Sequence, residues 1–252
     1  MGTNILVPGA DFSSSAVGFN AAVPEGLKGL WFFNRGVRKS RKNLALGGLD
    51  ADIFGTPADQ GTFIRFKGGA NFFQTKVKDT VGLTQIAVIK SPDTMADLAH
   101  SPMFVTNYGS GSADGFLSSG ISGAGIYANL SAANITMSGS RYTTSANTAV
   151  TSGGTSIAVD VTVWKMVASR VRADRAQRNN LTDGTTTAGN FTSQARVLAA
   201  GDFRIGSAYD GQWGGIADVA AVVMYDRFIT DAELSAMAAQ LKNVMAHIGI
   251  VA

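Results

Sequence analysis

The sequence predicts an all-β fold, a two-sheet antiparallel sandwich followed by a short C-terminal α-helix. Three observations lead to this prediction. From Leu27 onward the apolar segments are short and are separated by Gly, Asp, Asn and Ser, as strands joined by turns are. Several segments alternate apolar and polar residues with a period of two, which places one strand face in a core. Only near the C-terminus do apolar residues recur clearly at the spacing of an α-helix.

The composition fits one globular domain that is held together by burial. All-β sandwiches often fill a length of 252 residues as a single unit, and 45% apolar against 15% charged residues supplies a core. The chain has no cysteine, which excludes disulfides and thiolate metal sites. The net charge of +3 is small and aromatic residues do not alternate with basic ones, so we expect no nucleic-acid partner. No stretch has the apolar length of a membrane span, so we expect no membrane insertion.

We divide the chain into an arm, residues 1–26, and a sandwich domain, residues 27–252. The arm is rich in Gly, Ser, Ala and Pro and has too few apolar residues to bury itself. We therefore expect it to contact neighbouring subunits of a homo-oligomer. The alternative is that the arm lies along its own domain.

Nine segments are predicted as strands. In the clearest of them Ile157, Val159, Val161 and Val163 share one face. Residues 109–154 are rich in Gly, Ser, Thr and Asn and are expected to form long loops and short outer strands. The predicted strands are 29–34, 62–67, 84–90, 103–108, 135–138, 156–163, 164–172, 203–206 and 215–225.

The predicted helix begins with a capping box. Thr230 is followed three residues later by Glu233, and Asp231 suits the positive end of a helix dipole. Gly249 supplies the stop signal. Its buried stripe consists of Leu234, Met237, Ala238, Leu241 and Met245.

Several of these segments, in this order, resemble laminin G-like domains of the concanavalin A-like superfamily. A Trp-led strand, 164–168, precedes a segment, 180–184, that ends in an Asp-Gly turn. The closing strands and helix start of that family are matched by 203–207, 213–219, 224–227 and 230–234, and its early strands by 29–34 and 63–68. The resemblance runs from about Leu27 to Ile248 and implies a two-sheet jelly roll. It does not give a function, because this fold serves glycan binding, adhesion, particle decoration and glycoside hydrolysis.

The composition and the N-terminal region of the chain also resemble those of bacteriophage virion proteins, in which such domains occur in tail and capsid appendages. The shared features are the absence of cysteine, the small-residue arm and an N-terminus without the basic and apolar regions of a signal peptide. We therefore expect a virion protein. Otherwise the chain is cytoplasmic, or extracellular without a classical signal.

The sequence offers little machinery for catalysis, and we expect a non-enzymatic protein. Glycosidases on this fold use two neighbouring carboxylates, but Glu25 and Glu233 are the only glutamates and the latter is explained by helix capping. Asp50 and Asp52 are closely spaced but fall in an expected loop. Neither histidine lies in a recognisable triad context. The alternatives are a free carbohydrate-active protein, either a lectin or a glycoside hydrolase, and a calcium-stabilised adhesion domain.

If the sandwich loops bind surface glycans, they need exposed aromatic rings beside polar groups that bind hydroxyls. Tyr209, Asp210, Gln212 and Trp213 offer this mixture in a Gly-flanked loop. Asn107 and Tyr108 form a second candidate pair. The alternative is that these aromatic residues attach their loops to the core.

Calcium is the one ion that the resemblance implies, since many laminin G-like domains hold it at a sandwich edge. Asp114, Asp183 and Asp210 are the candidate ligands. For Asp183 a hairpin turn, signalled by its Asp-Gly pair, is the alternative. No other cofactor is expected.

Overall fold

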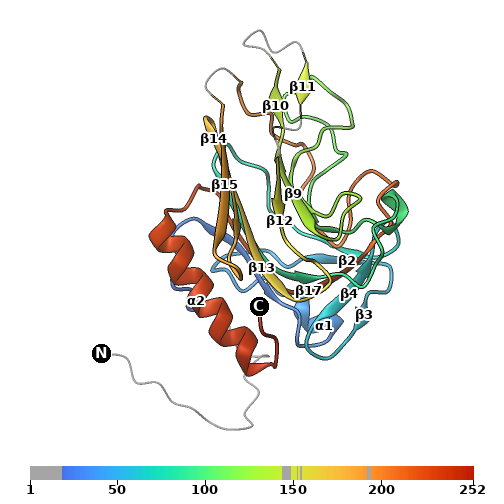
Figure 1. The fold of residues 1–252 in the computed structure, drawn as a ribbon, viewed down its shortest axis with the longest axis vertical. Helices are drawn as coiled ribbons and strands as arrows, with labels where there is room; N and C mark the ends of the chain where they lie inside the picture. Colours follow the sequence, from blue (N-terminus) through green and yellow to red (C-terminus); the bar gives the residue numbers. More distant parts are fainter. Residues whose placement is uncertain (1–18, 144–148, 152, 154, 192–193) are drawn as a thin grey trace.

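The computed structural model describes residues 19–143, 149–151, 153, 155–191 and 194–252. They form two antiparallel sheets that face each other, with one long helix, α2, outside the sandwich (Figure 1). This arrangement confirms the predicted two-sheet sandwich with a C-terminal helix. No helix in the described part of the chain has the length and apolar character required to cross a membrane.

Sheet A, the sheet that contacts α2, is built around its longest strand, β17. β17 pairs with β6 along one edge. Along its other edge, its first residues pair with β4 and its last residues pair with β1. In spatial order the strands are β15 (Thr185–Asn190), β14 (Arg175–Asn180), β13 (Lys165–Arg172), β6 (Leu83–Lys90), β17 (Ile216–Tyr225), β4 (Ile64–Lys67) and β3 (Ala58–Asp59), with β1 (Leu27–Phe32) beside β17.

Sheet B forms the other layer, and a two-stranded ribbon stands apart from both sheets. The order in sheet B is β12 (Thr155–Ala158), β9 (Asn134–Gly139), β8 (Ala124–Tyr127), β7 (Met103–Thr106), β16 (Arg204–Ile205), β5 (Phe72–Gln74) and β2 (Asp52–Phe54). The ribbon pairs β10 (Arg141–Tyr142) with β11 (Val150–Thr151). The helical segments are α1 (Val37–Ser40), a 3₁₀ turn (Leu98–His100) and α2 (Asp231–His247).

The central strands of sheet A are buried on both faces. On β6, Ala87 and Ile89 lie in the core between the sheets, whereas Ile86 and Val88 lie in a second core beneath α2. Successive side chains of a strand point to opposite faces, so one strand contributes to both cores. This explains why β6 and β17 are apolar almost throughout.

The C-terminal helix has the ends that the sequence predicts. The Thr230 side chain accepts a hydrogen bond from the Glu233 amide, and the Glu233 carboxylate accepts one from the Thr230 amide. At the other end Gly249 has a positive φ of 78°, and the Ile250 amide donates to the Met245 carbonyl at 3.0 Å. This is a Schellman motif, in which glycine avoids the cost of a left-handed conformation.

Most predicted strands are present with shifted ends, and one is markedly shorter. β12 ends at Ala158, whereas we predicted a strand over 156–163. Asp160 ends it, because its carboxylate accepts hydrogen bonds from the amide and hydroxyl of Thr162 and forms a turn. The nine predicted segments do not include β2, β3, β5, β8, β10, β11, β14 or β15.

The described end of the arm packs on its own domain. Phe19 makes an edge contact with Phe32, at 5.2 Å between ring centroids. The Gln240 side chain on α2 accepts from the Ala22 amide and donates to the Asn20 carbonyl. Residues 19–26 therefore lie along their own domain, residues 1–18 lie outside the described residues, and contact of the arm with neighbouring subunits stays a prediction.

Candidate functional site

The predicted stacking residue Trp213 is buried, with 5% of its surface exposed. Its ring makes edge contacts with Tyr108 and Tyr127, at 5.5 and 5.3 Å between centroids. A sugar cannot lie on a ring whose faces are covered by protein. This corrects the ligand interpretation of Trp213, which attaches its loop to sheet B.

Tyr209 is half-buried and likewise engaged by the protein. Its hydroxyl donates to the Asp202 carbonyl at 2.8 Å, and the Arg204 guanidinium lies 3.7 Å from its ring centroid. Cation–π packing of this kind occupies one face of the ring.

The other four candidates divide between surface and interior. Asn107 is fully buried and its side-chain oxygen accepts from the Ala124 amide at 2.7 Å. Tyr108 is half-buried, and burial, followed by the charge of Asp210, raises the pKa of its hydroxyl. Gln212 is exposed and Asp210 is half-buried, and the Gln212 amide donates to the Asp210 carboxylate at 2.8 Å. The six residues therefore do not form one binding surface.

The three calcium candidates are not brought together as a set of ligands. Asp183 accepts hydrogen bonds from Lys165 and Asn180, which lower the pKa of its carboxyl. Asp114 bonds to the Tyr142 hydroxyl. Among the described residues, no three His, Cys, Asp or Glu side chains are grouped as metal ligands would be. Calcium remains a prediction.

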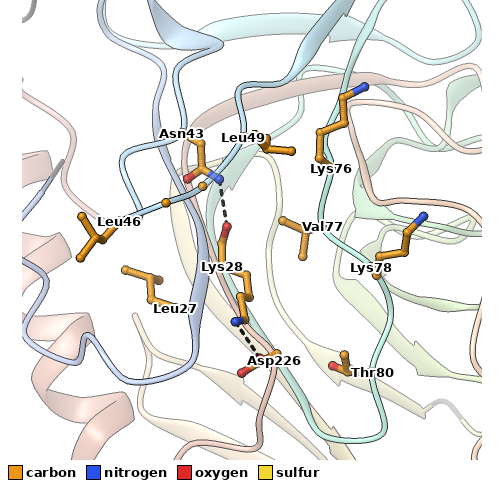
Figure 2. Close-up of a pocket in the computed structure, with 12 residues that line it drawn as sticks. Leu27, Lys28, Asn43, Leu46, Leu49, Lys76, Val77, Lys78, Thr80 and Asp226 are labelled. Atoms are coloured by element: carbon orange, nitrogen blue, oxygen red, sulfur yellow. Dashed lines mark hydrogen bonds and ion pairs between the residues drawn. The ribbon is translucent and has the colours of Figure 1, made fainter. Parts of the chain in front are cut away.

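The structure contains a pocket of about 390 Å³ that the sequence did not indicate. We call it the lysine pocket (Figure 2). It lies between β1, the loop that follows α1, and the segment after β5. Its lining residues are Leu27, Lys28, Asn43, Leu46, Gly47, Gly48, Leu49, Lys76, Val77, Lys78, Thr80 and Asp226.

One wall of the lysine pocket carries exposed leucines. Leu46 and Leu49 are 90% and 68% exposed, which is unusual for large apolar side chains. Figure 2 shows Leu46 on the opposite side of the pocket from Lys76 and Lys78, whereas Leu49 lies beside Lys76, and both lysine side chains extend away from the leucines. The pocket lining therefore combines apolar side chains with lysines.

Each lysine of this pocket has a carboxylate partner. Lys28 lies 3.1 Å from Asp226 and Lys78 lies 2.7 Å from Asp202, and Lys76 pairs with Asp52. The three lysine side chains are exposed, and ion pairs at exposed positions contribute only about 0–1 kcal/mol. The amines can therefore turn from these partners to an anionic ligand at small cost.

Asn43 holds the leucine-bearing loop in place. Its side-chain oxygen accepts from the Leu30 and Ala45 amides, both at 3.0 Å, and its nitrogen donates to the Lys28 carbonyl at 2.9 Å. A Cβ at Gly48 would overlap the Asn43 side chain, so glycine is required there. The loop is thus tied to β1 by a buried amide.

Comparisons with known proteins identify the fold. No family model and no curated protein matches the sequence. Among solved structures, a Trypanosoma rangeli sialidase mutant that displays trans-sialidase activity matches with a TM-score of 0.58 and 12% identity, over 87% of this chain. The chain shares the β-sandwich jelly-roll fold of this structure. The jelly-roll part of our prediction is thereby confirmed.

Two toxin domains are similar to the same extent. The binding domain of botulinum neurotoxin DC in complex with SialylT matches with a TM-score of 0.56 and 6% identity over 86% of this chain. The binding domain of paraclostridial mosquitocidal protein 1 matches with 0.56 and 9% over 87%. The chain spans only 34% of the sialidase, 52% of the first toxin domain and 53% of the second. At these identities the likeness concerns the fold alone.

Proposed function

We propose that this chain is a non-enzymatic adhesion module that binds an acidic glycan in the lysine pocket. The observation that carries the proposal is the pairing, in one pocket, of exposed leucines with three amines. A sugar ring presents C–H groups that pack on apolar side chains, and an acidic sugar adds a carboxylate. Lysine amines bind a carboxylate through charge-assisted hydrogen bonds.

The ligands of two structural neighbours support this ligand class. One neighbour is a Trypanosoma rangeli sialidase in complex with sialic acid, and another is the toxin binding domain in complex with SialylT. Sialic acid carries a carboxylate. This chain spans 33% of the first protein and 52% of the second, so the two complexes support a class of ligand and do not locate its site.

The lining of the pocket favours binding over cleavage. Asp226 is the one carboxylate among the lining residues, and it pairs with Lys28. The common mechanisms of glycoside hydrolysis use two carboxyl groups that flank the bond.

We further propose that the module decorates a bacteriophage particle, in which the N-terminal arm, residues 1–26, serves assembly with neighbouring subunits. The cysteine-free composition and the small-residue arm support this setting. In it the glycan would belong to a cell surface.

Binding of sialyllactose and lactose, measured by titration calorimetry, tests the glycan proposal. We expect the protein to bind sialyllactose and to leave it intact. The double variant Lys28→Gln and Lys78→Gln should lose about tenfold in affinity for each amine that bonds to the ligand carboxylate, about a hundredfold for both, because one charge-assisted hydrogen bond contributes about 1.5 kcal/mol. Release of free sialic acid would contradict the non-enzymatic assignment.

Lys67→Gln is the matched control. Lys67 is similarly exposed and lies 4.0 Å from Asp93, but it does not line the pocket. Its replacement should leave the affinity unchanged. Equal affinity for lactose and sialyllactose, or an equal loss in the control, would refute the lysine pocket as an acidic-glycan site.

A further inference from the structure

Strand β15 forms one edge of sheet A, and none of the described strands pairs with its outer side. In an antiparallel pair, alternate residues bond to the same neighbour, so about half of the six residues of β15 direct their backbone amide and carbonyl away from β14. Five of the six residues are exposed, and Gly189 is half-buried. β15 therefore presents a row of backbone groups with which another strand can pair.

β15 lacks the features that commonly protect a strand edge from pairing with another chain. It contains no charged residue and no proline, and its register with β14 continues without a bulge. Three of its residues are threonines, whose β-branched side chains favour extended backbone. The strand is therefore suited to a further partner.

The other edges of the two sheets are short, charged or covered. β3 has only two residues, one of which is Asp59, and on β2 the Asp52 carboxylate pairs with Lys76. At the end of β12 the Asn180 side chain donates to the Ala158 carbonyl at 3.2 Å. The loop that follows α1 bonds to the outer side of β1. Within the described part of the chain, β15 is thus the longest unprotected edge.

The N-terminal arm contains a segment whose composition matches this edge. The run Ile5-Leu6-Val7 is the longest aliphatic stretch in residues 1–18, and Pro8 follows it. Isoleucine and valine favour strands. Residues 4–7 carry no charged side chain that pairing with β15 would bury. Both partners are therefore uncharged and have a composition typical of strands.

The arm leaves the domain far from β15 of the same chain. The Phe19 amide donates to the Leu44 carbonyl at 2.9 Å, beside β1. Four strands, β17, β6, β13 and β14, separate β1 from β15, which corresponds to about 24 Å at the usual strand spacing. The residues between Val7 and Phe19 span up to about 40 Å when extended. This length lets residues 4–7 leave their own domain and reach β15 of a neighbour.

We infer that β15 accepts residues 4–7 from the arm of a neighbouring copy of this chain, which add a strand to sheet A. The inference rests on the assembly role proposed for the arm, and it names the surface that receives the arm. Backbone hydrogen bonds along β15 supply the affinity, as in other cases of strand addition. Each subunit donates one arm and accepts another, so the contact links copies reciprocally in a dimer or head to tail in a ring.

Disulfide trapping tests this contact, because the chain has no cysteine of its own. Protein with Ala188→Cys, at an exposed position of β15, is mixed under a mild oxidant with Ile5→Cys, Leu6→Cys or Val7→Cys protein, so that both strand faces are covered. At least one mixture should give a covalent dimer on a non-reducing gel, since Cβ atoms on paired strands lie about 4–5 Å apart. Ala58→Cys, exposed on the edge strand β3, is the matched control and should give none.

The trapping experiment also has outcomes that overturn the inference. No covalent dimer in any of the three mixtures, or equal dimer with the Ala58→Cys control, would exclude the arm from β15. A covalent dimer formed by Ala188→Cys protein alone would show that β15 pairs with β15 of another copy, and the arm would not be its occupant.

Ala188→Lys separates this inference from the assembly role of the arm. A charge on an edge strand opposes pairing, so the dissociation constant of the oligomer, measured by sedimentation, should rise about tenfold or more at an unchanged melting temperature. Ala58→Lys should leave it unchanged. If deletion of residues 1–18 gives monomers while Ala188→Lys assembles like the unmodified protein, the inference fails and the assembly role stands. A monomeric unmodified protein would contradict both.

Discussion

Replacing Glu233 by Gln tests how the amino-terminal end of α2 is held against sheet A. The carboxylate accepts from the Thr230 amide at 2.8 Å and from two Arg227 nitrogens at 3.0 and 2.7 Å. Arg227 first, and then the Thr230 amide, lower the pKa of Glu233 to about 2. A shift of this size corresponds to at most about 3 kcal/mol. The side chain is 28% exposed, so solvent screening reduces the expected value to about 1–2 kcal/mol.

The direction of the Glu233 pKa shift determines how its contribution to stability changes with pH. The folded-state pKa lies below the ordinary value of 4.5, so this stabilisation is present above pH 4.5 and is lost as the pH falls toward 2. Urea unfolding should show Glu233→Gln destabilised by about 1–2 kcal/mol at pH 7, and the difference should largely vanish near pH 2. Leu234→Ala is the control, because it removes a buried apolar side chain from the same turn of α2 and should cost about 2–5 kcal/mol at either pH. An equal Glu233→Gln penalty at both pH values would refute the electrostatic reasoning.

Three further predictions concern the buried residues Trp213 and Asp79 and the N-terminal arm. Trp213→Ala should lower the free energy of unfolding by about 3–5 kcal/mol, measured in urea, because it empties a packed aromatic cluster. The sialyllactose affinity of the folded protein should not change, and a selective loss of affinity would return Trp213 to the ligand site. Asp79→Asn leaves the Arg196 guanidinium buried without a charged partner and should cost about 3–5 kcal/mol, which a shift of the urea midpoint would report. Deletion of residues 1–18 should convert an oligomer into a monomer by native mass measurement with an unchanged melting temperature, and an unchanged mass would contradict the assembly role.

The sequence predicted those elements of the fold whose residue pattern has a single physical explanation, such as helix capping or burial of one strand face. The helix was recognised from Thr230, Glu233 and Gly249, since capping is local in sequence. Strands buried on at least one face were recognised from their apolar residues. β15 was missed because its side chains are exposed and consist of small polar residues, so that only pairing with β14 makes it a strand.

The candidate site was less predictable, because burial is decided by partners that are distant in sequence. Trp213 in a glycine-flanked loop has the same sequence appearance whether its ring is free or covered. Tyr127 on β8 covers it, and that strand lies in the segment with the weakest pattern. The lysine pocket joins three separate segments, none of which carries a motif. The exposed pair Leu46 and Leu49 beside Gly47-Gly48 was the one available signal, and it resembles an ordinary turn.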